Sequence, residues 1–214
     1  MLTVDISLSL DGFVAGPDPS LEEPLGRGGE RLHEWALSTE AFRSRHGGSG
    51  GAANVDSDMI DETVRRAGAT IMGRRMFSGG AGSWEDDPRA NGWWGEEPPF
   101  HHPVFVLTHH AREPLVLGET TFTFVTEGIE AALEEALAAA GDKDVAIGGG
   151  GSAVQQYLRA ALLDELQLHV VPVLLGGGVR LFEGHVAEAP AELQCTRNVA
   201  SPTGVAHLRY RVVK

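Results

Sequence analysis

The chain opens on a regular alternation of apolar and polar residues. Apolar side chains occupy the even positions from 2 to 10, and polar side chains occupy the odd positions from 3 to 9. A period of two residues is typical of a β-strand with one face on the core and the other toward solvent. The first ten residues therefore predict a half-buried strand. They carry no basic segment followed by a continuous apolar run, so they do not predict a secretory signal.

Short apolar runs separated by turn residues predict further strands along the chain. Apolar residues spaced three and four apart predict a helix over residues 129–140, closed by Gly141, and a second helix over residues 153–163. The alternation of strands and helices predicts an α/β fold with a mostly parallel sheet, helices on both faces and an antiparallel C-terminal hairpin. The predicted strands after the first are residues 69–72, 104–107, 122–125, 145–147, 166–175, 193–199 and 205–213.

We expect one domain spanning residues 1–214, interrupted by two long loops at about residues 12–54 and 78–100. The first loop contains a short helical candidate around residues 31–38. The second contains Trp84, Trp93 and Trp94 among prolines and acidic residues. These indoles either pack the loop onto the body of the protein or form a lid over a flat heterocycle.

Composition excludes several classes of protein. Hydrophobic residues make up 42% of the chain and charged residues 22%, which is typical of a globular protein. The net charge of −13 argues against a nucleic-acid partner, because phosphate backbones require a basic surface. The apolar stretch over residues 170–179 is too short to span a membrane, and we expect a cytoplasmic protein. The single Cys195 excludes an intramolecular disulfide or a multi-cysteine metal site, and its alternation with Leu193 predicts a core position.

A glycine-rich junction is the strongest local signal for a binding site. The predicted strand 145–147 runs into Gly148–Gly151, and a helix follows directly. Such a junction directs unpaired backbone N–H groups and the positive end of the helix dipole toward one point, which suits a pyrophosphate. The segment matches neither a Walker loop nor the GxGxxG fingerprint, and a turn without a ligand remains the alternative.

Two further polar segments follow predicted strands. Arg74 and Arg75 come after the strand 69–72, and Thr108 and His109 come after the strand 104–107. Guanidinium groups bind phosphate through paired hydrogen bonds, and open α/β sheets bind ligands at the carboxyl ends of their strands. The three strand ends together predict a site for a phosphorylated nucleotide.

The chain resembles the dihydrofolate reductase-like superfamily, most closely the reductase domain of bacterial riboflavin biosynthesis. Five segments carry the resemblance in the family's order and cover almost the whole chain apart from the two long loops. They are SLSLDGFVA at residues 7–15, MGRR at 72–75, VLT at 106–108, IGGGGSA at 147–153, and DELQLHVVPVLLGGGVRLF at 164–182.

The resemblance implies an NADPH-dependent reductase that works as a homodimer. It implies a hydride transfer to a C=N or C=O bond of a small pterin-like or pyrimidine-like heterocycle. It also implies an unusual cis Gly–Gly peptide bond in the glycine turn. The positions that match the family's cofactor site are Val14, Gly73, Arg74, Arg75, Met76, Thr108, His109, Gly149, Gly150, Gly151, Ser152 and Ala153.

The sequence offers fewer candidate residues for the substrate site than for the cofactor site. Asp11, Trp35 and Gly177 are its candidates, and no residue stands out as the proton donor. The segment around Glu34 and Glu40 lacks the motif that carries the pterin-binding carboxylate of true dihydrofolate reductases. A single cysteine excludes the zinc deaminase activity to which riboflavin-pathway reductases are often fused.

Two alternatives to this reductase stay open. One is a module that binds NADP(H) without turnover, and the other is a true dihydrofolate reductase. A metal hydrolase built on His101, His102, His109 and His110 is disfavoured, because adjacent residues of an extended chain point to opposite sides and no metal-binding motif accompanies them. We therefore expect no metal site.

Overall fold

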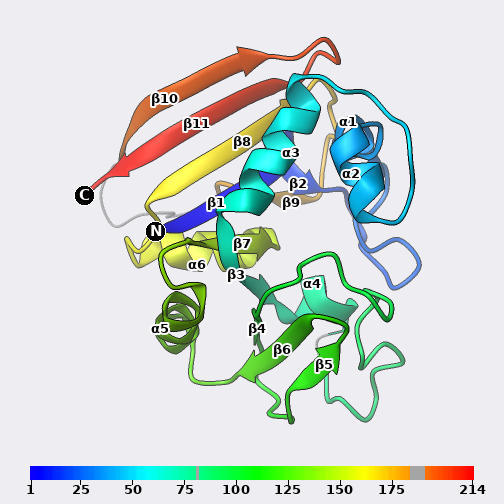
Figure 1. Ribbon diagram of the computed structural model, residues 1–214, viewed down its shortest axis with the longest axis vertical. Helices are drawn as coiled ribbons and strands as arrows, with labels where there is room; N and C mark the ends of the chain where they lie inside the picture. Colours follow the sequence, from blue (N-terminus) through cyan, green and yellow to red (C-terminus); the bar gives the residue numbers. More distant parts are fainter. Residues whose placement is uncertain (81, 184–190) are drawn as a thin grey trace.

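A twisted sheet of nine strands forms the centre of the molecule (Figure 1). The computed structural model describes residues 1–80, 82–183 and 191–214. Within these residues the strand order is β10-β11-β8-β1-β7-β3-β4-β6-β5. The strands are β1 (Leu2–Ser9), β3 (Ala67–Gly73), β4 (Val104–Leu107), β5 (Leu115–Leu117), β6 (Thr120–Val125), β7 (Asp144–Gly149), β8 (Glu165–Val171), β10 (Glu192–Ala200) and β11 (Ala206–Val213).

The six central strands are parallel, and antiparallel strands lie at both margins. β8, β1, β7, β3, β4 and β6 pair in parallel. β11 and β10 extend one margin as the predicted C-terminal hairpin, and β5 pairs with β6 at the other. A separate antiparallel pair joins β2 (Phe13–Ala15) to β9 (Val179–Arg180). The predicted mixed α/β architecture is confirmed, although the sequence pattern did not reveal β2, β5 or β9.

Helices cover both faces of the sheet. α5 (Ile129–Ala140) and α6 (Gly151–Arg159) lie on one face, and α3 (Val55–Arg66) crosses the other (Figure 1). No helix in the described ranges is long and apolar enough to cross a bilayer. Four short helical elements complete the helices of the described residues. They are the 3-10 helix η1 (Gly29–Leu32), α1 (Glu34–Leu37), α2 (Glu40–Arg45) and α4 (Arg74–Ser78).

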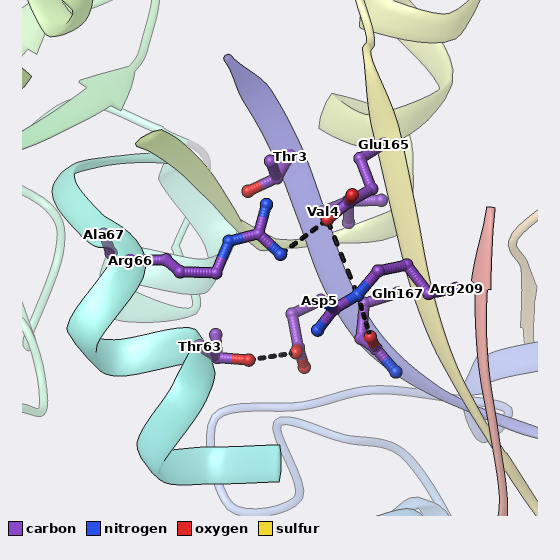
Figure 2. A pocket seen from close by; sticks show the side chains of 9 residues that line it. All are labelled: Thr3, Val4, Asp5, Thr63, Arg66, Ala67, Glu165, Gln167 and Arg209. Atoms are coloured by element: carbon purple, nitrogen blue, oxygen red, sulfur yellow. Dashed lines mark hydrogen bonds and ion pairs between the residues drawn. The ribbon is translucent and has the colours of Figure 1, made fainter. Parts of the chain in front are cut away.

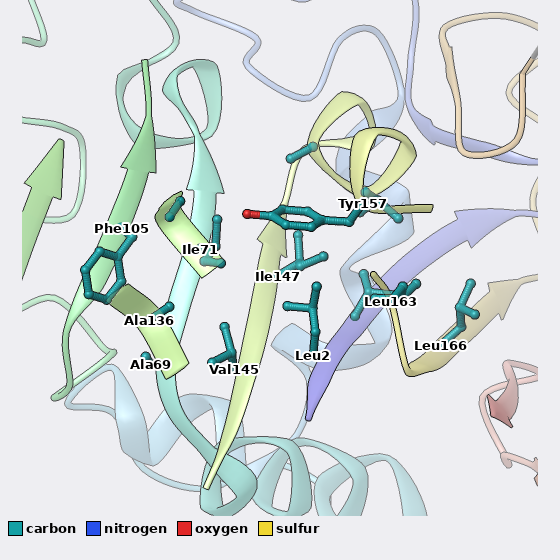
Figure 3. Packing of buried hydrophobic residues seen from close by; sticks show 14 of the residues in the cluster. Leu2, Ala69, Ile71, Phe105, Ala136, Val145, Ile147, Tyr157, Leu163 and Leu166 are labelled. Atoms are coloured by element: carbon teal, nitrogen blue, oxygen red, sulfur yellow. The ribbon is translucent and has the colours of Figure 1, made fainter. Parts of the chain in front are cut away.

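The main hydrophobic core lies between the sheet and helices α5 and α6. The even-numbered residues of β1 point into it, as the sequence alternation predicts, together with side chains from β7 and β3 (Figure 3). Tyr157 of α6 is fully buried there, and its hydroxyl donates to the carbonyl of Ile129 at 2.8 Å. Because an apolar stripe on each helix meets an apolar sheet face, this side of the fold follows from residue periodicity.

The opposite face of the sheet is polar and yet covered. Ser7 and Ser9 of β1 are only 6% and 1% exposed. Thr63 of α3 donates to the Asp5 carboxylate at 2.6 Å, and the indole of Trp35 in α1 donates to Ser7 Oγ at 3.0 Å. Helices from another part of the chain therefore cover the predicted solvent-facing side of this strand at Ser7 and Ser9, while Thr3 and Asp5 stay partly exposed.

The two segments that the sequence predicts as long loops differ in structure. The segment 12–54 contains β2, η1, α1 and α2, with α1 inside the predicted helical region. In the segment 78–100, Trp84 and Trp94 pack against the cluster around Phe77 of α4. Their indole N–H groups donate to backbone carbonyls, Trp84 to His110 at 2.6 Å and Trp94 to Phe77 at 3.1 Å. These contacts favour the packing interpretation of the aromatic loop over the lid.

The position of Cys195 differs from the prediction. β10 is the outermost strand at its margin, and both Cys195 and the neighbouring Leu193 are exposed. Alternation alone could not reveal this, because it does not show that β10 pairs only with β11 among the described residues and lies at the margin of the sheet. The prediction of a core cysteine is wrong.

His102 should make the stability of the protein depend on pH. Its Nε2 atom lies 2.8 Å from Thr70 Oγ1, and burial, together with the charges of Lys143 and Arg45, lowers the pKa of His102 to about 4. The unfolded chain then takes up a proton first as the pH falls from about 6.5, so stability is lost between pH 6.5 and 4. We expect a loss of about 1–2 kcal/mol from this group, since partial exposure weakens the effect.

The measurement is urea unfolding at pH 7 and pH 4.5 of the wild type and of His102→Gln, which keeps a hydrogen-bonding group near Thr70. The variant should lose less stability than the wild type between the two pH values. Equal losses would show that His102 does not contribute.

Candidate functional site

The candidate cofactor residues gather at one edge of the sheet. The parallel strands all end there, and Gly73 ends β3, Gly149 ends β7, and Thr108 follows β4. The strand order places these ends side by side as β4, β3, β7, β1 and β8. This is the edge at which open parallel sheets bind ligands, since the loops after the strands leave a crevice above them.

The glycine turn between β7 and α6 forms an open cradle. The Gly149–Gly150 peptide bond is cis, as the resemblance implied, and Gly149 has a φ of +119° that only glycine adopts readily. Gly150 precedes the first residue of α6 and has no side-chain cap. A Cβ atom built on Gly150 would meet no atom within 4 Å, and one on Gly73 would lie 4.0 Å from the Gly150 nitrogen. β3 and β7 thus pair as far as Met72 and Gly149, and the space that Cβ atoms on Gly73 and Gly150 would occupy is free.

Val14 lies beside this turn. A Cβ atom on Gly151 would come within 3.0 Å of Val14 Cγ2 and 3.3 Å of Val179 Cγ1, so the small β2–β9 sheet packs against the start of α6. Ala153 points into the core and can offer a ligand only its backbone, while Ser152 is exposed. Met76 borders the turn as well, because its Sδ lies 3.6 Å from the position of a Cβ on Gly149.

The two neighbouring arginines have different environments. The Arg74 side chain is 7% exposed, forms an ion pair with Asp87 and also donates to Ser78 Oγ. Its guanidinium lies 3.6 Å from the ring centre of Trp84. Burial raises the pKa of the Asp87 carboxyl, but the hydrogen bonds from Ser78 and Arg74 outweigh it and hold that pKa below its usual value. Arg74 therefore fastens the aromatic loop.

Arg75 is the exposed member of the pair. It lies on α4, which begins directly after Gly73 at the end of β3. The guanidinium of Arg74 is bound to Asp87, whereas that of Arg75 is exposed. The two arginines predicted to bind phosphate thus differ in surroundings, and the sequence could not show that Arg74 has a buried partner 13 residues away.

The Thr108 and His109 segment lies at the neighbouring strand end. Thr108 is 8% exposed, and its Oγ1 accepts from the backbone N–H of His110 at 3.1 Å. His109 is exposed. His109 is thus the side chain of this segment that is free to approach a ligand beside β3.

Of the substrate candidates, Trp35 lines a pocket. The pocket has a volume of about 240 Å³ and opens beside the end of β8 and the start of β11. Trp35 and Val171 contribute buried walls, while Arg31 and Glu34 add a positive and a negative group. The complete lining is Arg31, Glu34, Trp35, Ser38, Val171, Pro172, Val173, Thr203 and Val205.

Asp11 and Gly177 lie in a neighbouring loop cluster outside that pocket lining. The Asp11 carboxylate accepts from the backbone N–H groups of Leu175 at 3.1 Å and Gly176 at 2.8 Å. The hydrogen bond from Ser9 is the main cause that holds the pKa of Asp11 below its usual value. Asp11 therefore fixes the turn after β1 to the loop after β8. A Cβ on Gly177 would reach only Pro17, at 4.0 Å.

Sequence reasoning missed a group of buried ionisable residues next to the pocket. Asp5, His169, His207 and Asp56 form one continuous hydrogen-bonded chain beneath Trp35. The available signal was the polar positions of three strands, but their pairing depends on registers between distant segments. In the described ranges, no cluster of three His, Cys, Asp or Glu side chains has the arrangement of a metal site.

Solved structures with the same fold come from several organisms. A putative riboflavin biosynthesis protein from Shewanella sp. PV-4 is 22% identical, with a TM-score of 0.65, and the match covers 100% of this chain and 99% of that one. A pyrimidine reductase-like protein from Corynebacterium diphtheriae is 15% identical, with a TM-score of 0.51 and coverages of 100% and 91%.

A bifunctional deaminase and reductase from Thermotoga maritima, named for 5-amino-6-(5-phosphoribosylamino)uracil, is 11% identical, with a TM-score of 0.58. This chain spans 56% of that longer protein. No curated protein matches the sequence significantly. The sequence profile of the RibD C-terminal domain matches residues 1–207, so the chain belongs to the RibD C-terminal domain family.

Proposed function

We propose that the protein is an NADPH-dependent reductase that transfers a hydride to a C=N or C=O bond of a small heterocycle of the pyrimidine or pterin type. The observation that carries this proposal is the open cradle between Gly73 and Gly150 at the start of α6. Backbone N–H groups at a helix N-terminus stabilise a pyrophosphate, and a side chain at either glycine would fill the space it needs. The residues present fit a nicotinamide dinucleotide.

The strand order gives the cofactor a direction. Arg75 and His109 follow β3 and β4 and would hold the adenosine phosphate, while the glycine turn after β7 would hold the pyrophosphate. The nicotinamide end would then extend toward the end of β1, beside Val14. The Trp35 pocket lies past β1 at the end of β8, where a substrate would meet that end of the cofactor.

The chain's own residues would bind and orient the reactants. When bound, the reduced nicotinamide supplies the hydride and both electrons. Trp35 offers an apolar wall to a flat ring, and Glu34 and Arg31 can fix the ring's N–H groups and an anionic substituent. Holding donor and acceptor in contact contributes most of the rate in such a site.

A substrate screen tests the activity. NADPH oxidation is followed by absorbance with pyrimidine flavin precursors, pterins including dihydrofolate, and small carbonyl compounds. Oxidation with a heterocyclic acceptor is the expected result, and dihydrofolate turnover would identify the true dihydrofolate reductase alternative. NADPH binding with no turnover of any acceptor would instead favour a binding module without catalysis.

Gly73→Ala should weaken NADPH binding without harming the fold. Gly73 has a φ of −77°, which alanine adopts readily, and the new methyl group would have only the Gly150 nitrogen near it, at 4.0 Å. We expect about a tenfold increase in the Kd for NADPH, measured by fluorescence titration, with an unchanged melting temperature. Gly82→Ala also adds a methyl group to open space and serves as the control. Wild-type affinity in Gly73→Ala would remove the cradle as the binding site.

We also propose a cytoplasmic homodimer. Among the residues that the structure describes, no strand pairs with the outer edge of β10, and Leu193 and Val213 beside it are 40% and 46% exposed. An uncovered edge of this kind invites pairing with a second copy. Light scattering at micromolar concentration should give twice the chain mass of 22.8 kDa. A species of 22.8 kDa alone would refute the dimer.

A further inference from the structure

Four side chains form a continuous hydrogen-bonded chain through the polar face of the sheet. His169 Nε2 lies 2.8 Å from Asp5 Oδ1, and His169 Nδ1 lies 2.6 Å from His207 Nδ1. His207 Nε2 in turn lies 2.7 Å from Asp56 Oδ1. His169 is 1% exposed, and His207 and Asp56 are fully buried. Buried groups of this kind are costly unless each is paired, and here each one is.

The fold brings these residues together from separate segments. Asp5 lies on β1, and the β8–β11 register places His207 directly opposite His169. Asp56 reaches His207 from the first turn of α3. Trp35 covers both imidazoles, with ring-centre distances of 4.5 Å to His169 and 5.2 Å to His207. Trp35 is also the aromatic wall of the pocket.

The hydrogen bonds of this chain require one proton more than two neutral imidazoles carry. Each of the three contacts needs one proton, whichever of its two atoms holds it. Two neutral imidazole rings bring one proton each, so a third proton is held in the chain. Together with two ionised carboxyl groups, this gives the four side chains a net charge of −1. The three contacts are thus complete only when the His169–His207 pair shares that third proton.

Both ends of the chain lead toward solvent. Asp5, whose side chain is 27% exposed, lines a hollow of about 10 Å³, which is room for about one water molecule (Figure 2). At the other end, the exposed Thr203 donates its hydroxyl to Asp56 Oδ2 at 3.1 Å. Thr203 also lines the Trp35 pocket. The shared proton therefore lies between a water-sized hollow and the proposed substrate pocket.

We propose that the His169–His207 pair is the proton donor for the Trp35 pocket, with Asp56 and Thr203 as its outlet. This inference rests on the proposed reductase function. Reduction of a C=N bond adds a hydride to carbon, with both electrons from the reduced nicotinamide, and a proton to nitrogen. The Thr203 hydroxyl turns from Asp56 toward the substrate, and its O–H bond breaks as the substrate N–H bond forms. The Thr203 oxygen then accepts a proton from Asp56, once Asp56 has been protonated. Asp56 takes that proton from His207 Nε2, His207 draws on the proton shared with His169, and water replaces the lost proton.

The surroundings of the pair favour release of its third proton. Burial lowers the pKa of His207 below its usual value, and the hydrogen bond to Asp56 opposes that effect only in part. Burial raises the pKa of Asp5, but His169 and Thr63 outweigh it and hold the carboxyl below its usual value. The other ionisable groups that act on the chain are Arg209 of β11, near Asp5, and His33 at the start of α1.

Proton exchange measured by NMR tests the outlet without any substrate. In protein labelled with ¹⁵N-histidine, the N–H protons of His169 and His207 should exchange with water faster than the surrounding backbone amides. Thr203→Val removes the hydroxyl from an exposed turn and should slow that exchange about tenfold or more, while Thr203→Ser should leave it near the wild-type rate. The melting temperatures of all three proteins should agree.

Two results would overturn the proposal. One is an unchanged exchange rate in a folded Thr203→Val protein, and the other is ¹⁵N shifts that show both imidazoles neutral at pH 7. An NADPH titration of the same samples separates this inference from the proposed function. If the proteins bind NADPH normally and Thr203→Val leaves the imidazole exchange rate unchanged, only the proton-donor proposal is refuted. If the wild type fails to bind NADPH, the proposed reductase function is refuted, and the exchange rates still test the shared proton independently.

Discussion

Arg74→Ala is expected to destabilise the protein by about 3–5 kcal/mol, because it leaves the Asp87 carboxylate buried without its cation. Asp87 is 2% exposed, and its oxygens accept hydrogen bonds from Arg74, Ser78 and the backbone of Arg89. The truncation also removes the guanidinium that stacks on Trp84. The aromatic loop would lose its main polar attachment to α4. Urea unfolding at pH 7 measures the loss.

Two variants make this result specific. Arg75→Ala removes the neighbouring exposed arginine and should change stability by less than about 0.5 kcal/mol. The double variant Arg74→Met with Asp87→Leu removes both charges and should recover much of the lost stability, since a buried ion pair can be replaced by apolar side chains. A loss below about 1 kcal/mol in Arg74→Ala would show that the ion pair is not maintained in solution.

The ion pair of Arg74 is an example of a contact that the sequence could not predict. The motif at residues 73–75 correctly places two arginines at the end of β3, because a buried apolar run ending in glycine indicates a strand end. Which arginine faces a ligand depends on Asp87, which lies in an irregular segment without periodicity. A partner in such a segment has no signature in the pattern of the chain.

Helices and strands whose bounds are set by neighbouring residues in the sequence were predicted well. The helix Ile129–Ala140 has the predicted bounds, since its apolar spacing and the flanking glycines define it without help from the rest of the fold. β8 ends at Val171 rather than at residue 175, because Pro172 has no N–H to continue the ladder. The three-residue strand Leu115–Leu117 was missed, because it is too short for an alternation to be recognised.

The buried hydrogen-bonded chain depends on long-range pairing. Asp5 and His169 are 164 residues apart, and His169 and His207 are 38 apart. Each lies at a polar position of a strand, where a solvated face is the simplest expectation. Only the strand order and the placement of α3 over that face turn these polar positions into a buried network. Local patterns therefore predicted the strand ends at which the candidate cofactor residues gather, but not this network.

Arg75 should give the protein its preference for NADPH over NADH. The adenosine 2′-phosphate adds about two negative charges, and the chain has a net charge of −13, so the phosphate would be repelled unless a cation stood at the site. Arg75 is exposed on α4 beside the cradle, and a charge-assisted hydrogen bond contributes about 1.5–3 kcal/mol. We expect NADPH to bind about 10–100-fold more tightly than NADH.

Arg75→Ala should remove most of that preference by weakening NADPH binding while leaving NADH binding nearly unchanged. Fluorescence quenching titrations with both cofactors measure it, and Arg75→Lys should retain part of the preference because it keeps the charge but not the planar fork. Arg65→Ala removes an exposed arginine near the C-terminal end of α3. It changes the net charge of the protein by the same amount as Arg75→Ala and so controls for long-range electrostatics. Equal binding of the two cofactors by the wild type, or an unchanged preference in Arg75→Ala, would contradict the assignment of Arg75 to the 2′-phosphate.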